Sequence, residues 1–202
     1  MATDGGLMGL PLGAGVDLSL ATIRDTAGRF GVTVVDDFSD TDHARFVGLF
    51  EGHTITLYPR AAPEFARWFT VAHLYGHMVQ MANKTPRVDR ANALVLRVGE
   101  LLEPDDVQLI YDHEREAAEI GMRLVSAAEP DRLREMDVAY TRFFHADFRY
   151  LINVIETGER GAAMFAKYWK REPVPRELIG ADARDLVDLH SVPATTERII
   201  VV

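Results

Sequence analysis

Ala72-His73-Leu74-Tyr75-Gly76-His77 is the stretch that decides the fold, because it places two histidines four residues apart. In an α-helix, side chains at this spacing are about 40° apart around the axis and lie on one face. His73 and His77 can therefore bind the same metal ion. The residue directly after the first histidine, Leu74, cannot take up a proton. The stretch predicts a metal-binding helix and leaves its chemistry open.

Composition limits both the ligands and the partners. The chain has 202 residues, of which 48% are hydrophobic, so it can bury a core and we expect one main domain. It has no cysteine, so a metal must be bound by histidine, carboxylate and water, which suits zinc, iron, manganese or nickel. The formal net charge of -9 argues against nucleic acid as a direct partner.

The beginning of the chain does not resemble a targeting signal. Residues 1–15 are rich in glycine and lack the basic start and the apolar run of a secretory signal, so we expect a disordered leader. No stretch approaches the roughly 20 apolar residues of a membrane span. We therefore expect a cytoplasmic protein without a membrane partner.

Hydrophobic periodicity in the first half of the chain predicts two helices and a small sheet. The first helix is expected over residues 17–30. Short runs of β-branched and aromatic residues then predict three strands, at residues 32–35, 45–50 and 54–58. Residues 51–53 have the length and the glycine of a hairpin turn, so an antiparallel sheet is expected. Pro63 is well placed in the first turn of a helix that runs to Met81 and carries both histidines.

The second half of the chain is predicted to be mainly helical. Residues 84–90 are polar and contain Pro86, which favours a loop, and Pro104 is expected to stop a helix over residues 91–102. Further helices are expected at residues 114–128, 133–144 and 146–156, with a strand or docked tail at residues 199–202. We divide the chain into the leader, a metal-binding domain at residues 16–130 and a helical C-terminal subdomain with its tail at residues 131–202.

A third metal ligand is expected from the helix at residues 114–128. Four candidates lie where that helix is expected to begin: Asp112, His113, Glu114 and Glu116. A metal held by two histidines of one helix needs at least one more protein ligand. Negative charge is also favoured at a helix start without any metal. Both interpretations stay open on the residues alone.

Two segments resemble the ImmA/IrrE family of zinc metallopeptidases. Residues 69–77, Phe-Thr-Val-Ala-His-Leu-Tyr-Gly-His, resemble the family's Phe-Thr-x-Ala-His-Glu-x-Gly-His signature. Residues 114–125 resemble its second signature, in which Glu114 matches the third zinc ligand and Ala118 stands where the family has asparagine or aspartate. The strands before the first signature and residues 140–151 also resemble the family's layout. The resemblance implies a zincin-like α+β fold and cleavage of a regulatory protein.

The general base of such a peptidase is the glutamate that Leu74 replaces. General acid-base catalysis contributes about 10²- to 10⁴-fold, so we expect little ordinary peptidase activity. Tyr75 is about 100° further round the helix and should point away from the metal. Glu116 and Glu119 lie off the helix face of Glu114, so none of these residues is a convincing substitute.

Several functions stay open. We expect one divalent metal, zinc with iron as the alternative, bound by His73, His77 and Glu114, with His113 and Glu116 as possible alternates. The protein is then a degenerate peptidase or a metal-dependent enzyme with altered chemistry. The alternatives are a non-catalytic pseudo-peptidase that acts as a regulatory or protein-binding module, an active peptidase with a substitute base, and a non-haem iron enzyme with a two-histidine, one-carboxylate site. The sequence does not name a protein or small-molecule substrate.

The remaining histidines and basic residues have simpler interpretations. Four histidines are expected at the surface or in ordinary hydrogen bonds: His43, His53, His145 and His190. A basic and aromatic cluster near the C-terminal end comprises Lys167, Tyr168, Trp169, Lys170, Arg171 and Arg176. Against the net negative charge, we interpret it as a helix end and linker rather than a nucleic-acid surface.

Overall fold

A computed structural model describes residues 20–39, 47–58, 64–159, 165, 167–168, 177–179 and 198–201. Several predictions fall outside these residues: the leader at residues 1–15, the start of a helix at Pro63, the roles of His43 and His190, and the basic cluster from Trp169 onward. Within the described residues the elements are, in order, α1 (Leu20–Arg29), β1 (Thr33–Asp36), β2 (Gly48–Glu51), β3 (Thr54–Leu57), α2 (Glu64–Ala82), α3 (Pro86–Val95), α4 (Pro104–Ala128), the 3-10 helix η2 (Pro130–Arg132), α5 (Leu133–Thr157) and β4 (Arg198–Val201). The predicted α+β class is confirmed.

The sheet is mixed, with the strand order β1-β3-β2-β4. β2 and β3 form the predicted antiparallel hairpin, and Gly52 takes the positive φ of 60° that its turn requires. β1 pairs in parallel with β3, so the prediction of an antiparallel sheet is wrong for this strand. Strand periodicity does not specify which edge a strand joins, and β1 lies at the β3 edge while β4 takes the β2 edge. The predicted C-terminal strand is confirmed as β4, which is antiparallel to β2.

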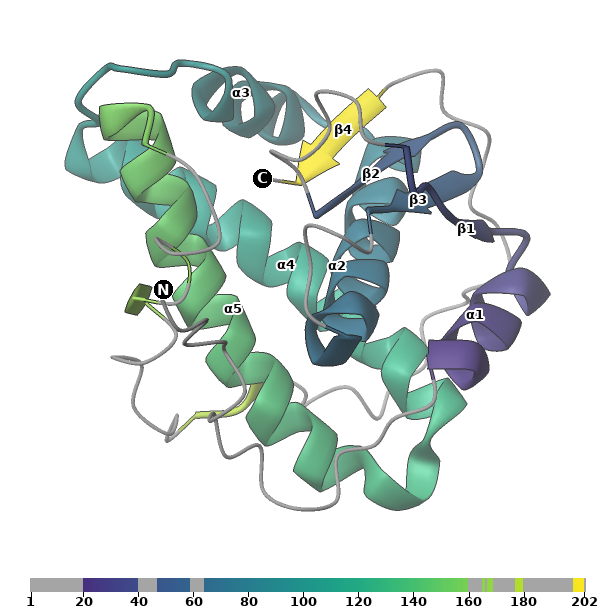
Figure 1. Ribbon diagram of the computed structural model, residues 1–202. Coiled ribbons are helices and arrows are strands. Elements are labelled where there is room, and N and C mark those ends of the chain that lie inside the picture. The colour runs from purple at the N-terminus through teal and green to yellow at the C-terminus, as the bar shows by residue number, and fades with distance from the viewer. Residues whose placement is uncertain are drawn as a thin grey trace, which may run out of the picture.

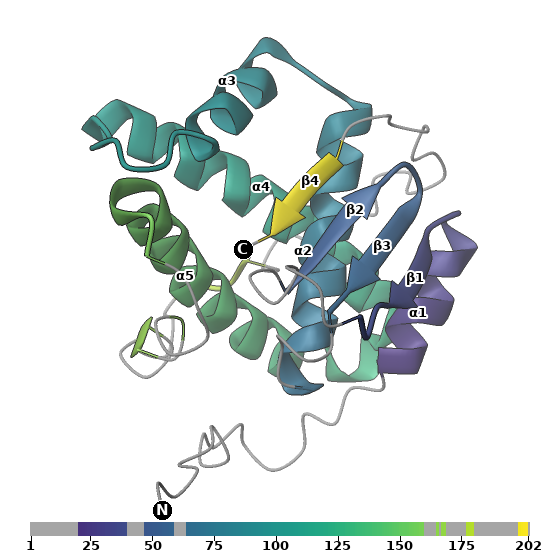
Figure 2. The ribbon, with the colours of Figure 1, turned by 45° about the horizontal axis from the view of Figure 1, so that its top comes forward.

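The sheet lies over α2, and α4 passes behind α2 (Figures 1 and 2). α1 contacts β1, α2 and α4, while α5 packs on α4. One hydrophobic cluster joins all these layers and includes Ile23, Phe50, Phe69, Met122 and Phe144. The contact between α4 and α5 crosses the domain boundary proposed at residue 130, and that division stays a prediction.

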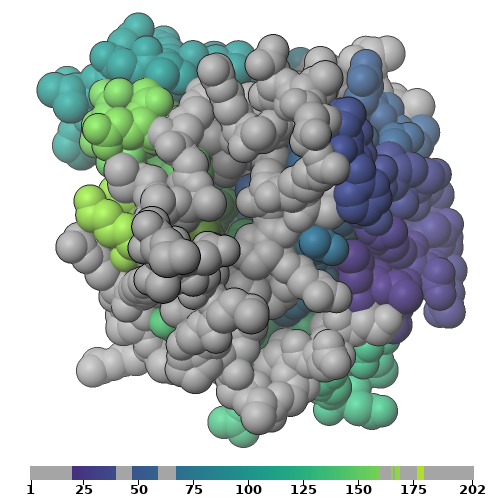
Figure 3. Space-filling model, in the orientation of Figure 1, coloured from purple at the N-terminus to yellow at the C-terminus, as the bar shows by residue number. Residues whose placement is uncertain are grey.

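The space-filling view shows which elements form the two sides of the molecule (Figure 3). In the space-filling view, α1 and β1 form one side of the molecule, and the α3 region lies at the opposite upper corner with the end of α5 (Figure 3). None of the helices in the described ranges has the length and apolar character needed to cross a membrane.

Two prolines begin helices where the sequence suggested loops or stops. The predicted loop at residues 84–90 is wrong, because Thr85 caps α3 by accepting a hydrogen bond from the Val88 N–H and Pro86 takes the first helical position. The predicted helix at residues 91–102 ends at Val95 instead. Pro104 does not stop a helix but opens α4. Proline is tolerated in a first turn because its missing N–H has no helical partner there.

Helices α4 and α5 are longer than predicted. α4 begins at Pro104, ten residues before the expected start, so Glu114 lies within the helix rather than at its N-terminus. The helix-start explanation for its negative charge therefore fails. α5 runs without a break from Leu133 to Thr157, where two helices were expected, and ends at Gly158 with φ of 74°.

Glycines allow α2 and α4 to cross with their backbones in direct contact. A Cβ atom on Gly76 would overlap the carbonyl group of Ala117, 2.6 Å from its carbon. A Cβ atom on Gly121 would lie 2.8 Å from the carbonyl carbon of Ala72. Carbon atoms in ordinary contact are about 3.5 to 4.0 Å apart. This close crossing brings the histidine face of α2 onto α4.

Candidate metal centre

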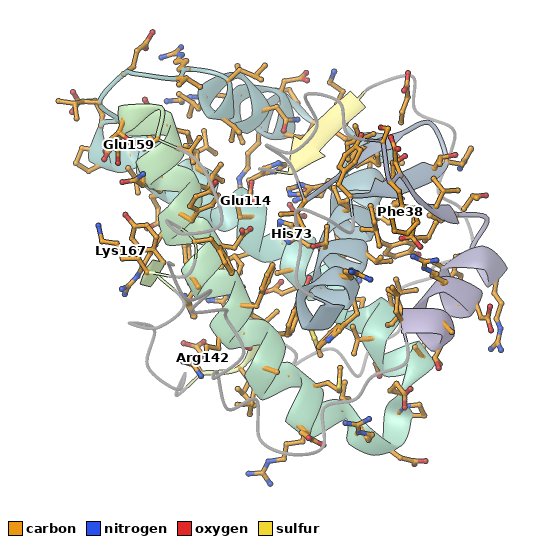
Figure 4. The ribbon with its side chains drawn as sticks, in the orientation of Figure 1. Phe38, His73, Glu114, Arg142, Glu159 and Lys167 are labelled. Atoms are coloured by element: carbon orange, nitrogen blue, oxygen red, sulfur yellow. The ribbon has the colours of Figure 1, made fainter. Side chains whose placement is uncertain are left out.

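The two motif histidines face α4, where Glu114 meets them. Figure 4 shows His73 on α2 and Glu114 on α4. His73 and His77 are each 4% exposed, and Glu114 is 7% exposed. Ionisable side chains are buried to this extent only when they are paired or bind a metal. The structure therefore brings together the three residues that the sequence selected as ligands.

The three potential ligand atoms form a nearly regular triangle. His73 Nε2 lies 3.0 Å from Glu114 Oε2, His77 Nε2 lies 3.2 Å from the same oxygen, and the two nitrogens are 3.1 Å apart. Ligand atoms that surround zinc tetrahedrally at 2.0 to 2.1 Å are about 3.3 to 3.4 Å from one another. The observed spacing is within a few tenths of an ångström of that requirement.

Gln80 determines which nitrogen of His77 carries a proton. Gln80 Nε2 donates to the carbonyl oxygen of His113 at 2.9 Å, which leaves Gln80 Oε1 facing His77 Nδ1 at 2.9 Å. Because Oε1 can only accept, Nδ1 must donate. In neutral His77, Nε2 then carries a lone pair directed at Glu114 Oε2 and His73 Nε2. A cation bound between these atoms would remove the repulsion between their lone pairs. The hydrogen bond from His77 Nδ1 to Gln80 is also of the kind that metal-bound histidines typically make with their second nitrogen.

The carboxyl of Glu114 is held in its charged form. Burial alone would raise its pKa. When His77 is protonated, its charge and the hydrogen bonds from His73 and His77 outweigh burial and hold the pKa of Glu114 well below its usual value. A metal ligand must be deprotonated, so Glu114 is ready to bind a cation.

Position 118, where the resemblance predicts asparagine or aspartate, carries no polar side chain. Ala118 is fully buried in the main hydrophobic cluster. The outer hydrogen-bond partner of His77 is instead Gln80, which lies one helical turn after it. Gln80 could have been found from the sequence, because it lies three residues after His77 and this spacing places both side chains on the same helix face.

The side chain that follows the first motif histidine is enclosed in the core. Leu74 is fully buried and packs against β2, where a Cβ atom on Gly48 would be 3.1 Å from Leu74 Cδ1. Tyr75 points toward Phe30, with ring centres 6.3 Å apart, and burial raises its pKa to about 12. Glu119 is paired with Arg115 at 2.9 Å. None of these side chains is placed to accept a proton at the metal.

The two alternate ligands lie beside the three-residue group. The ring of His113 is 5.1 Å from that of His77, and burial, followed by the charge of His77, lowers the pKa of His113 to about 4. Its Nε2 atom has no hydrogen-bond partner among the described residues. Glu116 accepts a hydrogen bond from Gln80 at 2.9 Å. Among the described residues, the group spaced to hold a metal is His73, His77 and Glu114.

Asp147 on α5 is a titratable residue near the centre that we did not select from the sequence. The pKa of Asp147 is raised to about 8, chiefly by burial and also by the charge of Glu114, while the charge of His77 partly opposes the rise. The residue nevertheless keeps partial solvent exposure. The available signal was an acidic residue seven positions from Tyr140, on the apolar face of a helix.

In comparisons with known proteins, no protein-family model, no curated protein and no solved structure matches the chain. The assignment of a function therefore rests on the geometry of this buried two-histidine, one-carboxylate centre.

Proposed function

We propose that the protein binds one zinc ion through His73, His77 and Glu114, on a zincin-like scaffold of the ImmA/IrrE type that has lost the usual peptidase base. The observation that carries this proposal is the convergence of two imidazole nitrogens and one carboxylate oxygen within 3.0 to 3.2 Å. The hydrogen bond from His77 to Gln80 adds support, because in neutral His77 it places the proton on Nδ1 and leaves Nε2 available to bind a cation.

The donor set favours zinc over harder cations. Two imidazoles and one carboxylate are a common catalytic zinc set, whereas magnesium and calcium prefer oxygen ligands. When bound, zinc supplies Lewis-acid chemistry, which polarises a carbonyl group or acidifies water. His73 and His77 supply neutral nitrogen ligands, Glu114 supplies the negative charge, and Gln80 orients the ring of His77.

Zinc affinity tests this proposal. Full-length protein without a histidine tag is titrated with zinc against a chromophoric chelator. Loss of an outer hydrogen-bond partner typically lowers metal affinity by about 10- to 100-fold. His77 is a direct ligand in this proposal, so His77→Ala should lower zinc affinity by more than that. His53→Asn is the control, because His53 lies in the β2–β3 turn, and it should bind zinc like the wild type. Equal affinity of the wild type, His77→Ala and Glu114→Gln would refute the site.

Asp147 favours a second candidate function, a metal-dependent hydrolase with a substitute acid-base group. A group with a pKa of about 8 can both accept and donate a proton near neutral pH. Asp147 is close enough to Glu114 and His77 for their charges to shift its pKa, and it is partly exposed. It would receive the proton of the attacking water and return it to the leaving group.

Hydrolysis of an activated ester by the zinc-loaded protein tests this second function. Removing an acid-base group typically costs about 10²- to 10⁴-fold in rate, so Asp147→Asn should lose most of the turnover while it retains zinc. Asp137→Asn is the matched control on the same helix, since Asp137 accepts a hydrogen bond from Thr141. Equal rates for the wild type and Asp147→Asn would contradict the role of Asp147 and favour a non-catalytic, regulatory protein.

A further inference from the structure

A cavity lies beside the metal centre. It has a volume of about 330 Å³ and is enclosed by the end of α2, the start of α3 and the middle of α4. His73, His77 and Glu114 do not line it. Pockets for small molecules typically measure about 300 to 1,000 Å³, so this cavity suits a small ligand.

His113 gives the cavity an unused hydrogen-bonding group. It lines the cavity, is only 2% exposed, and its Nε2 atom has no partner among the described residues. Buried polar atoms without a partner are rare because they forfeit their hydrogen bond to water. A ligand that hydrogen-bonds to this nitrogen would restore that bond.

The lining also carries one charge of each sign. Arg87 from α3 lines the cavity, is 53% exposed at its side chain and makes a single-nitrogen ion pair with Asp112 at 3.1 Å. The guanidinium has five donors, so it retains capacity for a second carboxylate. Arg87 stands in the first turn of α3, whose N-terminus also favours negative charge, and the cap residue Thr85 lines the cavity as well.

Glu116 on α4 supplies the negative charge. One of its oxygens accepts a hydrogen bond from Gln80 at 2.9 Å, and a carboxylate has further acceptor sites. The rest of the lining has an aliphatic part, formed by Val79, Val88 and Ile120, and the amide side chains of Gln80 and Asn83. The cavity therefore offers a cationic group, an anionic group and an apolar surface.

We propose that this cavity binds a free α-amino acid with an aliphatic side chain. The carboxylate pairs with Arg87 and the start of α3. The ammonium group pairs with Glu116 and donates to the unpartnered Nε2 of His113. The side chain packs on Val79, Val88 and Ile120. The inference goes beyond the metal-dependent function and does not depend on it.

Calorimetric titration of the full chain with L-leucine tests the proposal. Two analogues each lack one charged group: 4-methylpentanoate lacks the amine, and 3-methylbutylamine lacks the carboxylate. Loss of one hydrogen bond to a charged group typically lowers binding affinity about tenfold or more. Each analogue should therefore bind at least about tenfold more weakly than leucine. Absence of leucine binding at millimolar concentration, or equal binding of leucine and either analogue, would overturn the proposal.

Matched variants assign the two charged contacts. Arg87→Gln should lower leucine affinity about tenfold or more and leave the affinity for 3-methylbutylamine unchanged. Glu116→Gln should weaken leucine similarly and leave the affinity for 4-methylpentanoate unchanged. Arg90→Gln is the control on the same helix, because Arg90 pairs with Asp106 and is absent from the lining. Circular dichroism establishes that each variant is folded, and equal leucine affinity of Arg87→Gln, Glu116→Gln and Arg90→Gln would refute the assignment.

Discussion

Gly76→Ala should separate the two helices that build the metal centre. The new Cβ atom would lie 2.6 Å from the carbonyl carbon of Ala117, about 1 Å closer than ordinary contact allows. Because the opposing atoms belong to the backbone of α4, no side-chain rotation relieves the overlap. Alanine gains about 1 kcal/mol of helix propensity over glycine, while overpacking costs about 1 to 3 kcal/mol or more. Because the overlap is with backbone atoms, we place the overpacking cost at the upper end of this range and expect a net loss of roughly 2 kcal/mol in the free energy of unfolding.

The same displacement should weaken metal binding. Metal-ligand distances tolerate only about 0.2 Å, and a shift of about 1 Å between α2 and α4 would separate His73 and His77 from Glu114. Urea unfolding and zinc titration measure both effects. Gly28→Ala is the control, because Gly28 also lies in a helix but a Cβ atom there has no neighbour within 4 Å, so stability should rise or stay unchanged. A Gly76→Ala protein as stable as the wild type with unchanged zinc affinity would refute the close crossing.

Three further substitutions have distinct expected outcomes. Gln80→Leu should lower zinc affinity by about 10- to 100-fold, because it removes the hydrogen bond that orients His77, and unchanged affinity in chelator competition would contradict that role. Burial raises the folded-state pKa of Asp147 to about 8, above its ordinary value of 3.8. Between these pH values the folded metal-free protein keeps a proton on Asp147 that the unfolded chain has lost. The free energy of unfolding should therefore fall as pH rises from about 4 to about 8. Asp147→Asn should flatten this fall, and melting temperatures at pH 5 and pH 8 that change as in the wild type would argue against it. Leu74→Glu places a carboxylate in a fully buried site and should cost several kcal/mol of unfolding free energy, whereas an unchanged urea midpoint would indicate that the site is open to water.

The ligand helix and its partner were predictable because their signals are local. The spacing of His73 and His77 specifies a shared helix face, and apolar periodicity marks the helix that carries Glu114. The boundaries were less predictable. Pro86 and Pro104 can either end one helix or begin the next, and the choice depends on capping and packing that periodicity does not record.

Interactions between distant segments explain the other differences. The parallel pairing of β1 with β3 depends on which sheet edge each strand reaches. Asp147 comes near Glu114 only because α5 packs on α4, and no spacing along the chain encodes that proximity. The role of Gln80 is intermediate, since its spacing to His77 is local but its amide orientation depends on the carbonyl of His113 on α4.

The metal content of protein purified without a histidine tag tests the central claim most directly. Elemental analysis of the wild type should find about one zinc ion per chain, and His73→Ala should lose it while remaining folded. Iron in place of zinc, together with oxygen consumption, would instead support the non-haem iron alternative. A metal content near zero in both the wild type and His73→Ala, after incubation with excess zinc and desalting, would contradict the account.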